Sequence, residues 1–238
     1  MKRILYMLIK NLIYLPRFIT RLYRYAKNTE NYTEEQRYEL LKEIVEKANR
    51  GGNVKLEVTG QEHIPEKGFM LFPNHQGMYD MLAVIATCPH PVFIVAKKEV
   101  EKVPVLKQAL ACMNVFYMDR EDVRQSMKVI MNVAKEVKQG KNFAIFPEGT
   151  RSKKGNVLGE FKAGSFKAAT MAKCPIVPVA FINAFKPFDT NSIEPVTVQI
   201  HYLEPISYEE YKDMKTTEIA QEVKKRIEQK IEEQLGRK

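Results

Sequence analysis

Short apolar segments that alternate with helical stretches are the feature that most constrains the fold of this chain. The helical stretches fall at about residues 78–88, 103–112, 121–139 and 162–173, with a further one at about 216–235. Buried strands that alternate with helices usually pair in parallel, so the sequence predicts an α/β fold with a largely parallel, mixed sheet and helices on both faces. The apolar segments have the length of β-strands and occur at residues 54–58, 68–72, 92–96, 114–118, 142–146, 176–182 and 196–203.

The length of 238 residues is sufficient for one domain with a sizeable core and an appendage. We expect three parts: an amphipathic arm at residues 1–27, a connecting helix at 28–52 and the α/β domain at 53–238. The connecting helix has its own boundary signals, because a capping-box pattern begins at Thr33 and two glycines follow at positions 51 and 52.

The arm is basic and amphipathic. Residues 1–27 contain seven of the 38 Lys and Arg residues and none of the 29 acidic residues. Pro16 is expected to divide the helix near its middle. On a helix, one stripe is basic and carries Arg3, Lys10, Arg17 and Arg24, which recur every seven residues. The opposite side is apolar and carries Leu5, Leu8, Ile9, Leu12, Ile19 and Leu22.

A basic amphipathic helix with aromatic residues is typical of a segment that lies in a membrane interface with anionic lipids. Lys10 and Arg17 interrupt the apolar residues, so the arm lacks the uninterrupted length of a spanning helix or the core of a secretory signal. The sequence therefore predicts an interfacial location at the cytoplasmic face of the cell membrane. The alternative is a helix that packs on its own domain and exposes its charges.

The remaining composition excludes several function classes. Outside the arm, basic and acidic residues nearly balance and no base-reading motif is present, so we expect no nucleic-acid partner. Cys88, Cys112 and Cys174 are widely spaced within apolar segments. We expect these to be buried thiols rather than disulfides or metal ligands, and we expect no metal site.

His75 and Asp80, in the stretch PNHQGMYD, directly follow the apolar run GFMLF. On a continuous helix, side chains five positions apart point in different directions, so a functional pair requires His75 to lie in a loop and Asp80 in the helix that follows. Asp80 would then bind one ring nitrogen and leave the other free to accept a proton. Because no G-x-S-x-G is present, a base at this position would activate the hydroxyl of a substrate. The alternative is the polar start of a helix.

Two further polar clusters follow apolar segments. The stretch IFPEGTRS, residues 145–152, combines Gly149, a hydroxyl and the Arg151 fork, which suits an anion such as phosphate, although it is not a Walker A loop. The stretch YMDRED places Arg120 at the end of another expected strand, where it can supply a second guanidinium. Taken alone, each cluster has an alternative interpretation as a solvated turn.

In their order and spacing, NH-x-x-x-x-D, a strand ending in Arg, FPEGTRS and VPVA resemble the motifs of the glycerolipid acyltransferases. Within that family, the 1-acyl-sn-glycerol-3-phosphate acyltransferase branch is the most similar. The resemblance covers about residues 54–205 and extends more weakly into the arm.

The resemblance implies a role for each matching residue. It implies that His75 is the general base and that Asp80 orients it. It associates Arg120, Glu148, Gly149, Thr150 and Arg151 with acceptor binding, and Lys97 and Lys98 with a lysine-bearing stretch that contacts phosphate.

The implied reaction is transfer of an acyl chain from acyl-CoA or acyl carrier protein to the sn-2 hydroxyl of lysophosphatidic acid, without a cofactor. The implied alternatives are glycerol 3-phosphate or another lysolipid as acceptor, and a non-catalytic lipid-binding protein of the same fold. Two residues depart from the family pattern: Gly77 stands where Ser is common, and Asn114 where Gly is common. These departures weaken inferences about acyl-chain preference.

Overall fold

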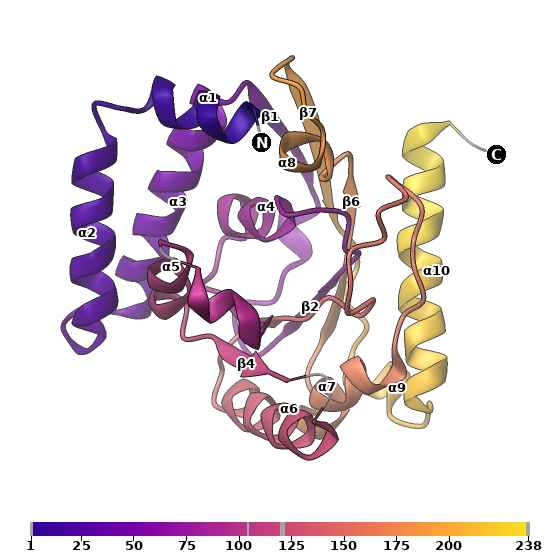
Figure 1. Ribbon diagram of the computed structural model, residues 1–238. Coiled ribbons are helices and arrows are strands. Elements are labelled where there is room, and N and C mark those ends of the chain that lie inside the picture. The colour runs from indigo at the N-terminus through magenta and orange to yellow at the C-terminus, as the bar shows by residue number, and fades with distance from the viewer. Residues whose placement is uncertain (1, 104, 120–121, 237–238) are drawn as a thin grey trace.

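The computed structural model describes residues 2–103, 105–119 and 122–236 (Figure 1). Within this part of the chain, seven strands form one sheet in the order β1-β7-β6-β2-β5-β3-β4. Neighbouring strands are parallel except β6 and β7, which are antiparallel. The strands are β1 (Val54–Thr59), β2 (Met70–Pro73), β3 (Phe93–Lys97), β4 (Phe116–Met118), β5 (Phe143–Ala144), β6 (Ile176–Ile182) and β7 (Val196–Tyr202).

Helices cover both faces of this sheet (Figure 1). The first face packs on α3 (Glu34–Gly51), α4 (Asp80–Thr87) and α5 (Leu106–Cys112). The second face packs on α6 (Val123–Lys138), α7 (Lys167–Ala172) and α10 (Thr216–Leu235). Two single-turn helices are α8 (Lys186–Asp189), between β6 and β7, and α9 (Tyr208–Tyr211), between β7 and α10.

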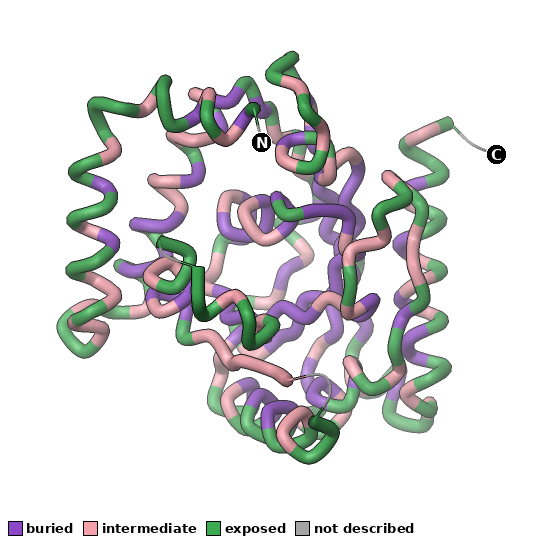
Figure 2. The backbone as a smooth tube through the Cα atoms, viewed as in Figure 1, coloured by how far each residue is buried: buried purple, intermediate pink, exposed green. Residues whose placement is uncertain are grey.

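Alternation along the strands divides the apolar side chains between two cores. In β2, Leu71 belongs to the core beneath α3 and α4, whereas Met70 and Phe72 belong to the core beneath α6 and α10. Figure 2 shows buried residues concentrated along the strands and on the inner sides of the helices. A strand buried on both faces explains why GFMLF is apolar throughout.

The predicted α/β fold with a largely parallel, mixed sheet is therefore confirmed. Some strands are shorter than expected: β4 lacks the first two of the predicted residues 114–118, and β5 contains only Phe143–Ala144 of the predicted residues 142–146. The chain turns immediately afterwards, where the N–H of Gly149 donates to the carbonyl of Phe146, and this turn begins the FPEGTRS loop.

The N-terminal arm forms two helices, α1 (Lys2–Lys10) and α2 (Leu15–Lys27), with Pro16 in the first turn of α2. Its inner side packs on the body, where Met7, Phe18 and Leu22 are buried. No helix within the described ranges is long and apolar enough to cross a membrane.

Two residues of the arm differ from their expected placement. Arg3, expected on the basic surface stripe, is buried and donates to the carbonyls of Gly52 (2.5 Å), Glu194 (2.7 Å) and Pro187 (3.2 Å). Leu22, expected on the exposed apolar side, packs inward. The periodicity of the arm correctly indicated helices but not which stripe the body covers.

Candidate active site

The candidate site lies at one edge of the sheet, where four parallel strands end. The neighbours β6, β2, β5 and β3 run in the same direction. The loops that leave their carboxyl ends therefore meet at the same edge, which is where sites form in α/β sheets. These loops carry His75 after β2, Glu148 and Arg151 after β5, Lys97 and Lys98 at the end of β3, and Asp189 after β6.

His75 lies in the loop and Asp80 is the first residue of α4, as the spacing argument requires. The Nδ1 of His75 lies 2.8 Å from Oδ2 of Asp80. Because an ionised carboxylate only accepts hydrogen bonds, this contact places the proton of a neutral imidazole on Nδ1 and leaves Nε2 as an acceptor. The imidazole stacks on Phe146 with ring centroids 4.3 Å apart, and 22% of the His75 side chain stays exposed. A substrate can therefore reach the ring.

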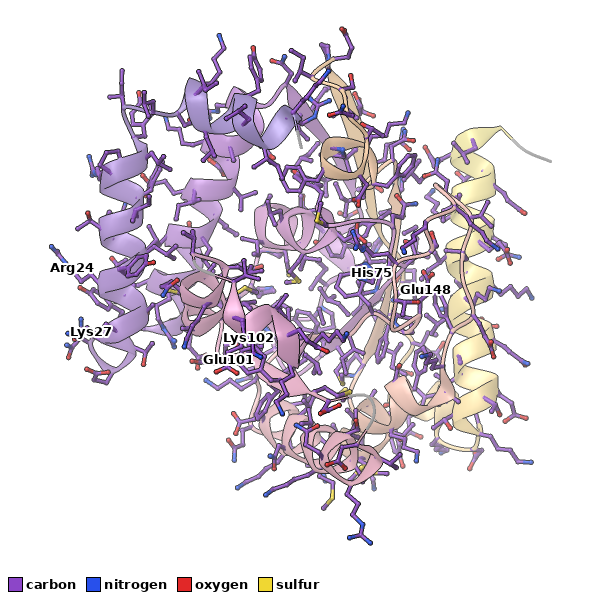
Figure 3. The ribbon with its side chains drawn as sticks, in the orientation of Figure 1. Arg24, Lys27, His75, Glu101, Lys102 and Glu148 are labelled. Atoms are coloured by element: carbon purple, nitrogen blue, oxygen red, sulfur yellow. The ribbon has the colours of Figure 1, made fainter. Side chains whose placement is uncertain are left out.

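Carboxylates bind the amide groups of four consecutive residues, 75–78. The N–H of His75 donates to Oε1 of Glu148 at 2.8 Å. Those of Gln76 and Gly77 donate to Asp80 at 2.6 and 3.0 Å. The N–H of Met78 donates to Oδ2 of Asp189 at 2.9 Å. Three acidic side chains from different elements thus fix this loop, and Figure 3 shows His75 and Glu148 side by side.

Two of these carboxylates are buried, which affects their protonation. Burial raises the pKa of Asp80, and its hydrogen bonds with His75 and the loop amides oppose this effect. Burial also raises the pKa of Glu148, whose second oxygen accepts the N–H of Gly159 at 2.9 Å. Both Glu148 oxygens are therefore engaged by backbone amides, one of which belongs to His75.

Two amide side chains beside His75 attach the loop to β6. Asn74 donates to the carbonyl of Phe181 and accepts its N–H, at 3.2 and 2.7 Å. Gln76 also donates to this carbonyl, at 2.8 Å, and accepts the N–H of Ala184 at 2.8 Å. Neither residue was predicted from the sequence as part of the site. Their polarity after an apolar run was a signal, but their backbone partners could not be identified from sequence.

Arg151 is held by an acidic side chain from another loop. Its Nη1 donates to Oδ1 of Asp189 at 2.9 Å, and both side chains are partly exposed. The N–H of the next residue, Ser152, donates to the carbonyl of His75 at 2.9 Å. The FPEGTRS loop therefore contacts the His75 loop directly. Gly149 adopts a positive φ of 70°, and the Thr150 side chain is exposed.

Two further predicted binding residues, Lys97 and Lys98, lie at the same edge but farther along the sheet. Lys97 pairs with Glu99 at 2.9 Å, and Lys98 lies 4.0 Å from Asp119. Both lysine side chains are exposed, so each is accessible to an anion. Arg120 lies outside the described residues.

Comparisons with known proteins agree with the motifs. A family model described as acyltransferase matches residues 55–182. A 1-acyl-sn-glycerol-3-phosphate acyltransferase of Borreliella burgdorferi is 31% identical over 182 residues, covering 74% of this chain and 72% of the relative. One from Salmonella typhimurium is 32% identical over 161 residues, covering 67% of this chain and 65% of the relative.

The fold also has a solved counterpart. The crystal structure of the 1-acyl-sn-glycerophosphate (LPA) acyltransferase PlsC from Thermotoga maritima is similar with a TM-score of 0.80 and 20% identity, covering 99% of this chain and 98% of that one. This likeness shows the α/β fold, and the family model places the chain among the acyltransferases. The chain belongs to the acyltransferase family, and the relatives compared above carry the name of its lysophosphatidic acid branch.

Proposed function

We propose that this acyltransferase moves an acyl chain from an acyl thioester to the sn-2 hydroxyl of lysophosphatidic acid, giving phosphatidic acid for phospholipid synthesis. The observation that carries the proposal is the His75–Asp80 contact of 2.8 Å beside the FPEGTRS loop. The His75 loop offers an accessible base, and the FPEGTRS loop offers the guanidinium of Arg151. The names of the relatives favour this acceptor.

In this mechanism His75 is the general base. Its Nε2 takes the proton of the sn-2 hydroxyl as the oxygen attacks the thioester carbonyl, forming a C–O bond and a tetrahedral intermediate. The intermediate collapses with cleavage of the C–S bond, and the thiolate leaves and takes up a proton. Asp80 stabilises the imidazolium that forms and holds the ring in its reactive orientation.

The loop amides do not serve as free donors to the oxyanion. Each N–H of residues 75–78 already donates to Glu148, Asp80 or Asp189. Oxyanion donors in acyl transfer are commonly backbone amides, and a loop beside the base is well placed to supply them. In this fold those amides instead fix the position of His75, so stabilisation of the oxyanion falls to other groups.

The acceptor's phosphate is proposed to bind Arg151, with Arg120, Thr150, Gly149, Lys97 and Lys98 as further candidates from the family motifs. Glu148 contributes indirectly, because both of its oxygens hold backbone amides. A guanidinium binds phosphate well because its N–H groups form a planar fork.

The first test measures acyl transfer from a labelled acyl thioester in mixed micelles. Lysophosphatidic acid, glycerol 3-phosphate and a choline-headed lysolipid serve as parallel acceptors, and acyl-CoA and acyl carrier protein as parallel donors. Formation of phosphatidic acid in preference to the other products supports the proposal. Preference for glycerol 3-phosphate or the choline lysolipid would transfer the assignment to that acceptor, and lipid binding without transfer would favour a non-catalytic role.

Asp80→Asn separates the catalytic role of this carboxylate from its effect on stability. Because burial raises its pKa, the folded state binds the proton more tightly than the unfolded chain, and this stabilising contribution is lost as pH rises through the folded pKa. We therefore expect the variant at about pH 8 to melt no lower than the wild type, with the difference shrinking as pH falls. Its acyl transfer falls steeply, because Asn no longer stabilises the imidazolium.

Melting temperatures measured from about pH 8 down to acidic pH check the expectation, and Asp213→Asn, at an exposed position, is the control. A variant that melts below the wild type at about pH 8 would show that ionised Asp80 stabilises the fold.

Arg151→Ala should mainly raise the KM for lysophosphatidic acid. Loss of one hydrogen bond to a charged group costs about 2 kcal/mol, or roughly 30-fold in KM. Turnover at saturation stays close to the wild type if Arg151 holds the phosphate equally in ground and transition states. Initial rates over a range of acceptor concentrations test this. A large fall in kcat with unchanged KM would place Arg151 at the reacting atoms instead.

We also propose that the arm binds the cytoplasmic face of the membrane, at a surface containing anionic lipids. Lys10, Arg17 and Arg24 are exposed, and Figure 3 shows Arg24 and Lys27 pointing away from the body. The outer side of the arm also exposes a group of large apolar side chains: Leu5, Leu8, Ile9, Leu12, Ile13, Tyr14, Ile19 and Tyr23. Exposed apolar and basic residues on one surface suit a lipid interface.

A further inference from the structure

Asp189 contacts both loops of the proposed active site. One carboxylate oxygen accepts the N–H of Met78, three residues after His75, at 2.9 Å. The other accepts from Nη1 of Arg151 at 2.9 Å. Asp189 is the last residue of α8, which follows β6, so it belongs to neither motif. No sequence pattern singled it out.

Gly77 permits this contact. A Cβ added to Gly77 would lie 2.4 Å from Oδ2 of Asp189 and 2.8 Å from the Cα of Phe185, and both distances are shorter than real contacts. Any residue larger than glycine at this position would therefore displace the Asp189 carboxylate or α8. Gly77 and the contact made by Asp189 are thus two parts of one local arrangement.

The helix that carries Asp189 is itself fixed in place. The N–H of Asp189 donates to the carbonyl of Phe185 at 2.9 Å. The buried Arg3 of α1 donates to the carbonyl of Pro187 at 3.2 Å. In addition, Pro187 is buried and the ring of Phe188 packs on Tyr79 with centroids 5.4 Å apart. The carboxylate therefore projects from a short helix that contacts both the body and the arm, which makes it a defined support for Arg151.

We propose that Asp189 is a positioning residue that holds the Arg151 guanidinium beside the His75 loop, ready for the acceptor's phosphate. The inference rests on the proposed function. A guanidinium has five N–H donors, and Asp189 accepts from Nη1 alone, which leaves other donors for phosphate oxygens. Fixing the side chain beforehand reduces the conformational entropy that phosphate binding must overcome.

An alternative role predicts the opposite effect. If the carboxylate occupied the place of the phosphate, its removal would free Arg151 and tighten acceptor binding. The close approach at Gly77 favours permanent support, because the backbone of the His75 loop is adapted to the carboxylate. The direction of the change in acceptor KM distinguishes the two roles.

A double-mutant cycle tests the proposal with the full-length protein. The kcat/KM for lysophosphatidic acid is measured for the wild type, Asp189→Ala, Arg151→Ala and the double variant. We expect Asp189→Ala to lower kcat/KM about tenfold, through KM, in the wild-type background, and less than about twofold when Arg151 is absent. The KM of the thioester donor should not change. Asp189→Asn should recover part of the loss, because its amide oxygen can still accept a hydrogen bond.

Glu222→Ala is the matched control. Glu222 accepts from Nε of Arg226 at 2.7 Å on α10, and this pair is about as exposed as the Asp189 pair. Its removal should leave kcat/KM unchanged, and melting temperatures of all variants show whether each one folds.

The outcomes are distinguishable. Suppose that the wild type transfers acyl chains to lysophosphatidic acid. The positioning role is then overturned if Asp189→Ala lowers kcat/KM equally with and without Arg151, or if it lowers the acceptor KM, and the proposed function stays intact. Absence of wild-type transfer to lysophosphatidic acid overturns the proposed function, and the positioning role fails with it.

Discussion

Replacing His75 by Ala is expected to abolish acyl transfer while the protein still folds and binds membranes. General-base catalysis contributes about 10²–10⁴-fold to a rate, and this chain offers His75 as the base. Asp80 and Phe146 contact the ring, and 22% of the His75 side chain is exposed. The variant should therefore lose kcat rather than stability. Transfer from a labelled thioester to lysophosphatidic acid measures the effect.

His63→Ala is the matched control, because His63 also pairs with a carboxylate, at 2.9 Å from Glu204. It follows β1, which is parallel to β7, and β7 is antiparallel to β6, so this pair lies at the other edge of the sheet. The His63→Ala variant should leave turnover unchanged. If His75→Ala kept near-normal turnover, His75 would not be the base, and a loss shared by both variants would point to a general structural effect.

The sheet was predictable because the apolar pattern that indicates a strand lies within the sequence of the strand itself. Strands such as β2 and β6 are buried on both faces and read as continuous apolar runs. Strand lengths were less predictable. In β5, Phe143 and Ala144 are followed by Ile145 and Phe146, which continue the apolar run between the strand and the turn. Ile145 is buried in the core without belonging to the strand, and composition does not distinguish the two situations.

The local part of the site was also predictable, because His75 and Asp80 are close in sequence and a loop is needed to bring them together. The partners from distant segments were not. Asn74 and Gln76 bind the backbone of β6, and any residue can supply a backbone carbonyl. Asp189 is one of 29 acidic residues, and only the fold brings it to Arg151. The burial of Arg3 likewise depends on three distant carbonyls.

The second large effect is expected at the arm, where Leu12→Ser with Ile13→Ser should weaken binding to anionic vesicles. Leu12 and Ile13 are 65% and 90% exposed, between α1 and α2, so their removal costs the fold little. Burial of a Leu or Ile side chain is worth about 1.5–3 kcal/mol, so partial insertion of two gives roughly a 100-fold change in partition coefficient. Deleting residues 1–27 is a poorer test, because it would also remove Met7, Phe18 and Leu22 from the core.

Sedimentation with phosphatidylglycerol-containing vesicles measures this partition, and Val123→Ser with Met131→Ser is the matched control. Val123 and Met131 are also exposed apolar residues, but they lie on α6, which covers the other face of the sheet (Figure 1). The control should bind as the wild type does, since the arm joins a group of exposed apolar side chains to a basic segment without acidic residues, whereas α6 contains Glu136. Equal binding by the arm variant would show that this surface does not enter the lipid, and a loss confined to the α6 variant would assign membrane contact to the opposite face.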